Sequence, residues 1–172
     1  MKKIIFLLAL TCFAISSVAQ DITSEVAKKT LPSGYEKISG NEIKLHLTQR
    51  LHRYKSYDMM TGLNQDHFYR VGDVLIFVNA AQSNEKYQPL TSLKRGLDAM
   101  EKNDSNYHSE ILTVNGNSIL TTRQVSDDLG NYLVIIYNSA KTKYFKAQIR
   151  YNTSDSAKAE KIVKHIEESL NF

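Results

Sequence analysis

The segment Tyr132-Leu-Val-Ile-Ile-Tyr137 consists of six consecutive apolar or aromatic residues, three of them β-branched. Six residues are too few for a typical buried helix and suit a strand. A half-solvated strand would carry polar residues on one of its two alternating faces, whereas both faces are apolar here. We therefore expect this segment to be the central strand of a sheet, with layers packed above and below it.

Further strands follow from the same kind of pattern. Val74-Leu-Ile-Phe-Val78 is also apolar on both faces and is expected to be a neighbour or near neighbour of the first strand. Residues 107–114 and 117–125 flank Asn115-Gly116, the strongest short hairpin signal, because both turn residues must take positive φ. Residues 144–151 alternate between apolar and polar side chains. Together with 132–137, these segments predict an antiparallel meander of four strands.

Two amphipathic helices accompany the strands. The first is predicted from about Pro89 to Lys102, and Gly96 in its middle suggests close packing against the sheet. Its apolar stripe consists of Leu90, Leu93, Leu97 and Met100. The second closes the chain after Thr153-Ser154-Asp155, which offers capping oxygens. Its apolar stripe consists of Ala159, Ile162, Val163, Ile166 and Leu170.

The N-terminal half has a less regular pattern. Residues 35–38 and 42–48 are predicted to be strands around a Ser39-Gly40-Asn41 turn, and 67–71 is expected to rejoin the sheet. Residues 49–72 show no period of 2 or 3.6. A long loop without a pattern is uncommon inside a compact domain and is often functional.

The first nineteen residues have the composition of a secretory signal peptide. Lys2 and Lys3 form a basic region, residues 4–15 are a nearly unbroken apolar run, and Ser17-Val18-Ala19 offers small residues for cleavage. The apolar run is shorter than the roughly 20 residues that a membrane span needs. We therefore predict a signal peptide at 1–19, one domain at 20–172, export to the periplasm or the extracellular space, and no transmembrane segment in the mature chain.

Cysteine content and net charge argue against two classes of protein, lipoproteins and nucleic-acid-binding proteins. Cys12 is the single cysteine and lies inside the predicted signal, preceded by Thr11 and with Ala9 three positions before it. Lipid attachment prefers a small residue and a leucine there, so an outer-membrane lipoprotein is not expected. Removal of Lys2 and Lys3 leaves 20 basic against 18 acidic residues, a net charge of +2. Nucleic-acid binding usually leaves a much stronger basic footprint.

The order of elements resembles the Mog1/PsbP-like family. Leu31-Pro32-Ser33-Gly34-Tyr35 is similar to the Pro-x-Gly-aromatic segment before the first strand in that family. The Asn115-Gly116-Asn117 hairpin, the strands 132–137 and 144–151, and the helix ending in Glu168-Ser169-Leu170-Asn171-Phe172 resemble its C-terminal half. The resemblance implies an α+β fold, an α/β/α sandwich in which helices pack on both faces of an antiparallel sheet. It also implies a largely non-catalytic role, as in GTPase-binding partners, photosystem subunits and chaperones.

Sequence motifs for catalysis and metal binding are missing. There is no Gly-x-Ser-x-Gly elbow, no glycine-rich phosphate loop and no His-x-x-x-His spacing. The five histidines are isolated, and Asp127-Asp128 is better explained by a hairpin turn than by a calcium loop. We therefore expect no catalytic residue, no metal site and no cofactor.

The segment without a pattern contains the candidate binding residues. Arg50, Arg53, Tyr54 and Tyr57, with Lys55 between them, have the composition of a binding hot spot. A solvated basic loop would explain the same residues. The sequence thus predicts an exported, non-catalytic binding or accessory protein whose partner is an unidentified protein or envelope glycan. The alternative is an envelope hydrolase whose site is assembled only in three dimensions.

Overall fold

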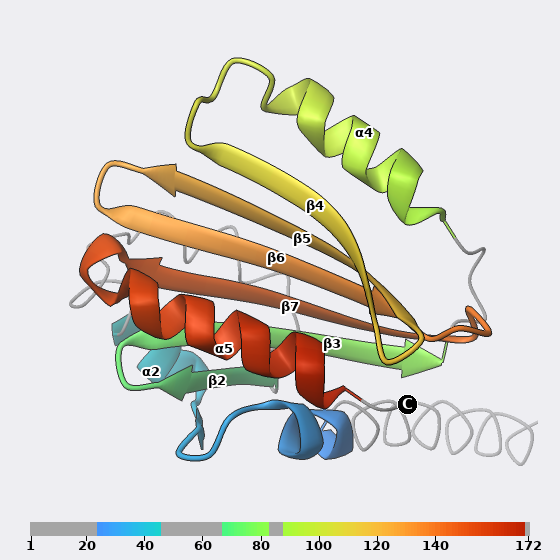
Figure 1. The fold of residues 1–172 in the computed structure, drawn as a ribbon. Coiled ribbons are helices and arrows are strands. Elements are labelled where there is room, and N and C mark those ends of the chain that lie inside the picture. The colour runs from blue at the N-terminus through green and yellow to red at the C-terminus, as the bar shows by residue number, and fades with distance from the viewer. Residues whose placement is uncertain (1–23, 46–66, 83–87, 171–172) are drawn as a thin grey trace, which may run out of the picture.

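Seven antiparallel strands form one sheet in the order β1-β2-β3-β7-β6-β5-β4 (Figure 1). The computed structural model describes residues 24–45, 67–82 and 88–170. The strands are β1 (Glu36–Lys37), β2 (Phe68–Val71), β3 (Val74–Gln82), β4 (Tyr107–Val114), β5 (Asn117–Ser126), β6 (Leu129–Tyr137) and β7 (Lys143–Asn152). The helical segments are 24–30, α2 (Gly40–Leu45), α4 (Leu90–Met100), the 3₁₀ turn η3 (Thr153–Asp155) and α5 (Ser156–Ser169). The α+β class with an antiparallel sheet is confirmed.

The predicted meander is confirmed as β4-β5-β6-β7. Asn115 and Gly116 take φ values of 51° and 78°, as a two-residue hairpin of this type requires. The fourth strand of the seven is β7, so the prediction that 132–137 is the central strand is wrong by one position. Apolar residues on both faces show that a strand is covered, but they do not give its place in the order. The strand β3 is a near neighbour of β6, as predicted, because only β7 lies between them.

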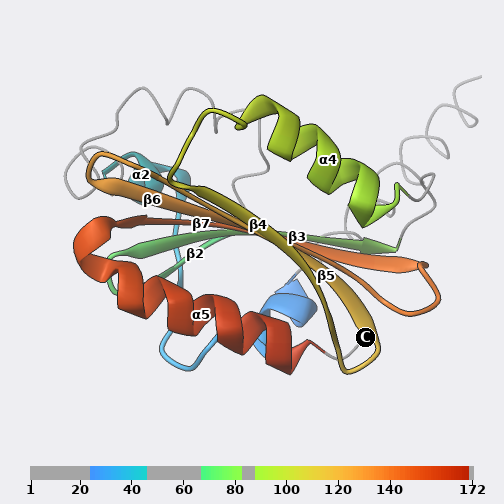
Figure 2. The ribbon, with the colours of Figure 1, turned by 45° about the horizontal axis from the view of Figure 1, so that its top comes forward.

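The helix α5 packs on one face of the sheet (Figure 2). Its buried side chains are the predicted stripe, Ala159, Ile162, Val163 and Ile166, followed by Leu170. They join a cluster with alternate residues of the inner strands, among them Val78, Ile119, Val134, Ile136, Phe145 and Ile149. The residues of 153–155 form a 3₁₀ turn, and the N-cap Asp155 makes no side-chain capping hydrogen bond, so the predicted capping by this segment is wrong.

The helix α4 contacts the sheet less extensively. Leu90 is buried with Leu120 and Ile135, whereas Leu93 and Leu97 are only partly buried against that cluster. Gly96 is exposed, and a β-carbon placed on it would have no heavy atom within 4 Å. The prediction that Gly96 marks close packing on the sheet is therefore wrong.

The segment after β1 is the helix α2, so the predicted strand 42–48 is wrong over residues 42–45, and its residues 46–48 lie outside the described residues. Ser39 and Glu42 form a capping box at its start. The backbone N–H of Ser39 donates to Glu42 Oε2 at 2.7 Å, and the backbone N–H of Glu42 donates to Ser39 Oγ at 3.4 Å. These two reciprocal hydrogen bonds stabilise the first turn of α2. This helix was not predicted from the sequence because Ile43, Leu45 and Leu47 alternate as in a strand. The buried Ile43 packs in a small cluster with Ile38, Phe68, Leu75 and Phe77.

Candidate functional site

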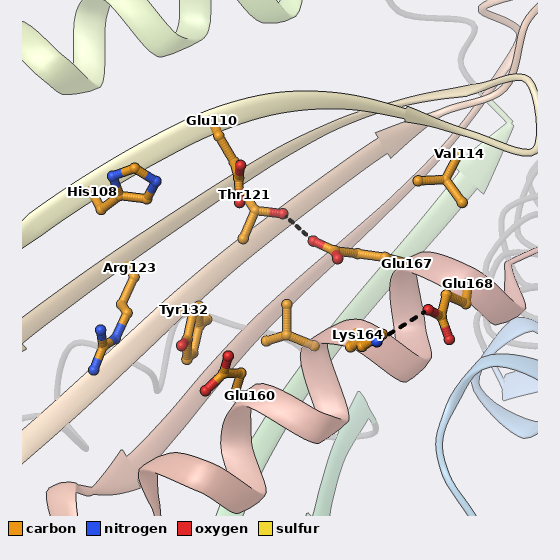
Figure 3. A pocket seen from close by; sticks show the side chains of 11 residues that line it. His108, Glu110, Val114, Thr121, Arg123, Tyr132, Glu160, Lys164, Glu167 and Glu168 are labelled. Atoms are coloured by element: carbon orange, nitrogen blue, oxygen red, sulfur yellow. Dashed lines mark hydrogen bonds and ion pairs between the residues drawn. The ribbon is translucent and has the colours of Figure 1, made fainter.

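A groove of about 470 Å³ lies between α5 and the strands β4, β5 and β6 (Figure 3). We call it the α5–β4 groove. It is lined by His108, Glu110 and Val114 of β4, Thr121 and Arg123 of β5, Tyr132 of β6, and Glu160, Val163, Lys164, Glu167 and Glu168 of α5. The groove exists because the apolar stripe of α5 packs mainly on β6 and β7. On the neighbouring strands Ile119 and Thr121 are still buried, whereas His108, Glu110 and Arg123 remain exposed.

Two rows of paired residues form the floor. In the first row His108 of β4 is opposite Arg123 of β5, which is opposite Tyr132 of β6. In the second row Glu110 is opposite Thr121. Directly paired residues of antiparallel strands project on the same face of a sheet. Strand register therefore fixes the spacing of these polar groups.

Arg123 is held in place by aromatic residues. Its guanidinium donates to the hydroxyl of Tyr151 at 3.5 Å and to Ser156 Oγ at 3.4 Å, and it lies 6.0 Å from the ring centroid of Tyr132. The rings of Tyr132 and Tyr151 stack with centroids 5.6 Å apart. Burial, and then the neighbouring Tyr151, raise the pKa of Tyr132 to about 12. Tyr132 is therefore a neutral phenol at physiological pH.

Carboxylates dominate the walls. Glu167 Oε1 accepts a hydrogen bond from Thr121 Oγ1 at 2.5 Å, and burial raises the pKa of Glu167. Lys164 lies 3.9 Å from Glu168, an exposed pair. Within the described residues, Glu110, Glu160 and Glu167 have no ion pair. Because four glutamates face only Arg123 and Lys164, the lining carries a net charge of −2 with His108 neutral.

The arrangement is poorly suited to nucleophilic catalysis. The hydroxyl of Thr121 lies beside a carboxylate, which is one element of an activated nucleophile. However, Thr121 belongs to an internal strand that pairs with both β4 and β6. The backbone N–H groups around it are committed to these ladders, so none is left to form an oxyanion hole. In the part of the chain that the structure describes, no group of three His, Cys, Asp or Glu residues could hold a metal ion.

The structure does not test the site residues predicted from the sequence. Arg50, Arg53, Tyr54, Lys55 and Tyr57 fall outside the described residues, so that site stays a prediction. The groove was missed because its residues look like the solvent face of ordinary strands. One signal was present in residues 108–114: the face of His108 and Glu110 becomes apolar at Leu112 and Val114. A strand face that changes from apolar to polar side chains halfway along indicates that the element packed on it extends over the apolar half alone.

Comparison with known proteins gives little guidance. No family model matches the chain, and no curated protein sequence matches it. One similar solved structure is PA94 from Pseudomonas aeruginosa, described as a protein of unknown function and a candidate regulator. The two are 14% identical, the match covers 58% of this chain and 72% of that chain, and the TM-score is 0.39. None of the helices in the described ranges is long and apolar enough to cross a bilayer.

Proposed function

We propose that this chain is an exported, non-catalytic binding module with a Mog1/PsbP-like α/β/α sandwich, and that the α5–β4 groove is its binding surface. The observation that carries the proposal is the excess of carboxylates in the groove: Glu110, Glu160 and Glu167 line it and form no ion pair among the described residues, although Glu160 interacts electrostatically with Arg123. A free protein gains nothing from concentrating such groups. A ligand that brings positive charge would neutralise them.

Partial burial makes Glu167 a more effective binding group than the exposed Glu110 and Glu160. Glu167 is half-buried, and Glu110 and Glu168 also raise its pKa by repulsion. A cation bound beside Glu167 would therefore relieve both desolvation and like-charge repulsion. Two charges at this depth interact more strongly than an exposed surface pair does. Phosphate backbones would be repelled, so nucleic acid is not the partner.

The partner is either a protein or an envelope glycan. A protein segment with lysine or arginine complements the groove by charge. An amine-bearing or hydroxyl-rich glycan would use the carboxylates together with the phenol of Tyr132 as hydrogen-bond partners. The proposed basic site at Arg50, Arg53, Tyr54 and Tyr57 would take an anionic partner and is a separate proposal.

The test is purification of the tagged protein from its native cells, with and without the groove charges. Glu110→Gln combined with Glu160→Gln should lose the co-purifying partner. Glu25→Gln combined with Glu36→Gln changes the net charge equally on exposed residues outside the groove and should retain it. Both variants should show the thermal midpoint of the wild type. Equal recovery of the partner by both variants would exclude the groove as the binding surface.

The raised pKa of Glu167 beside Glu110 favours a second candidate, an envelope hydrolase with a pair of carboxylates. In such an enzyme Glu167 would be the general acid and Glu110 the base or nucleophile. Incubation with purified peptidoglycan, followed by chromatography of released fragments, tests this candidate. Release by the wild type but not by Glu167→Gln would establish hydrolysis and overturn the binding proposal.

A further inference from the structure

The strand β4 forms one edge of the sheet, and α4 packs against it through hydrogen bonds from Tyr107 and Ser109 to Asp98. Among the described residues it pairs only with β5, over eight consecutive positions without a bulge. It contains neither proline nor lysine, the residues with which proteins commonly protect such an edge. The opposite edge strand, β1, has only two residues, Glu36 and Lys37, both exposed. The edge at β1 is therefore too short to pair with another strand over any length, whereas the edge at β4 could pair over eight residues.

The hairpin determines which backbone groups of β4 face outward. A two-residue hairpin of this type closes on a hydrogen-bonded pair, here Val114 and Asn117. Alternation along the strand then directs the backbone groups of Leu112, Glu110 and His108 toward β5, and those of Ser109, Ile111 and Thr113 outward. The N–H of Tyr107, next in the outward series, donates to the carbonyl of Asp104 at 3.2 Å and not to β5, in agreement with this assignment.

The edge at β4 and the α5–β4 groove share the same strand. The side chains of His108 and Glu110 project into the groove, while the backbone groups between them point outward from the sheet. A strand added along β4 would place every second side chain over the groove. At those positions it would face Glu110, with Glu160 and Glu167 on the opposite wall (Figure 3).

We propose, building on the proposed function of the groove, that the partner is an extended basic peptide segment that adds to β4 as an eighth strand. Its backbone pairs with Ser109, Ile111 and Thr113. Its lysine or arginine side chains alternate, and those on the α5 side contact the unpaired carboxylates. Its intervening residues are apolar, because on the other face they adjoin the partly buried Ile111.

Charge decides between this occupant and a second copy of the chain. A two-fold pairing of β4 with itself would bring two grooves of net charge −2 together across the new ladder. Like charges at such positions are destabilising. A basic segment has the opposite effect at every groove position.

The experiment uses a fluorescein-labelled nonapeptide of alternating valine and lysine as the probe, with binding followed by fluorescence anisotropy. The wild type should bind it, and affinity should fall as salt increases. The same peptide with glutamate in place of lysine should not bind. Hydrogen exchange should slow at the amides of Ser109, Ile111 and Thr113 on binding, while those of His108 and Glu110 should not change.

Thr113→Pro removes one outward N–H, and its side chain is exposed, so the fold should tolerate the change. Thr113→Ala retains the N–H and is the matched control. We expect about fivefold or greater loss of affinity for the proline variant, the loss that one hydrogen bond and a steric block predict. The alanine variant should bind like the wild type, and both should have similar thermal midpoints.

Other outcomes separate the two proposals. Binding that disappears in Glu110→Gln/Glu160→Gln but persists in Thr113→Pro would retain the groove and overturn strand addition. Absence of binding by the wild type would overturn the basic-peptide proposal. The native co-purification would still test, independently, whether the groove is the binding surface. A wild-type dimer that Thr113→Pro converts to a monomer, measured by analytical ultracentrifugation, would identify β4 as a self-interface and also overturn it.

Discussion

The ring of Tyr151 occupies the space in which a side chain at position 130 would lie. Gly130 and Tyr151 are directly paired in the β6–β7 ladder, and a β-carbon on Gly130 would be 2.1 Å from the Cζ atom of Tyr151. Tyr151 is completely buried by this arrangement. The absence of a side chain at Gly130 therefore allows Tyr151 to stack on Tyr132 and to contact Arg123 at the end of the α5–β4 groove.

Gly130→Ala should destabilise the protein. The new methyl group overlaps a ring with 0% exposure, so Tyr151 or the backbone must move. Overpacking of this kind typically costs about 1–3 kcal/mol. Urea unfolding followed by circular dichroism measures the change.

Gly96→Ala is the matched control, with the opposite expected sign. Gly96 is exposed within α4, and a β-carbon there meets no heavy atom within 4 Å. Because alanine is favoured over glycine inside helices, stability should rise by up to about 1 kcal/mol. Equal unfolding midpoints for the two alanine variants would contradict the packing described for Gly130.

Ile166→Ala should cost roughly 2–5 kcal/mol, as large-to-small changes in cores do. Ile166 has 0% exposure in the cluster between α5 and the sheet. Lys164→Ala, on the exposed side of the same helix, should change stability by less than about 0.5 kcal/mol. Urea midpoints of the two variants that coincide would show that α5 does not dock through this stripe.

Sequence patterns predicted the C-terminal half of the fold well because its rules are local. The Asn115-Gly116 turn and the apolar stripe of α5 each follow from a few neighbouring residues. Local rules also explain why the strand predicted at 42–48 is wrong over its described part, residues 42–45. The alternation of apolar and polar residues in this segment predicts a strand. The hydrogen bonds of the capping box, formed by Ser39 and Glu42, stabilise the start of a helix instead.

The groove was not predictable in the same way. Glu110 and Glu167 are far apart in the sequence, and each has the spacing of a solvent-facing residue. They line one groove because α5 packs mainly on β6 and β7 and leaves the part of β4 around Glu110 exposed. The position of α5 across the sheet cannot be predicted from the sequence of the helix or of β4 alone.

The signal peptide can be tested by mass. Cleavage after Ala19 should give a mature chain that begins at Gln20, because Ser17-Val18-Ala19 provides the small residues that the peptidase requires. Intact-mass spectrometry of protein recovered from the native cells makes the measurement. A species that begins at an acylated Cys12 would instead identify a lipoprotein.

Glu167→Gln should stabilise the protein at neutral pH, and the gain should shrink as the pH falls toward the unfolded pKa of the glutamate. Burial raises the pKa of Glu167 in the folded state, so its favourable contribution is complete below the unfolded pKa of about 4.3. That contribution is lost as pH rises through the folded pKa, because the folded state then holds a desolvated charge. Glutamine is never charged and can still accept the hydrogen bond of Thr121. Urea unfolding of both proteins from pH 4 to pH 8 tests this expectation.

Asp98→Asn should show the opposite pH dependence. Hydrogen bonds from Lys94 at 2.7 Å and from Ser109 at 2.5 Å lower the pKa of Asp98 in the folded state. The stability that its charge contributes is therefore present above the unfolded pKa of about 3.9 and is lost as pH falls through the folded pKa. The asparagine variant should be less stable than the wild type at pH 7, with the difference shrinking toward pH 3. If the stability differences of both variants changed in the same direction with pH, the environment assigned to Glu167 or to Asp98 would be wrong.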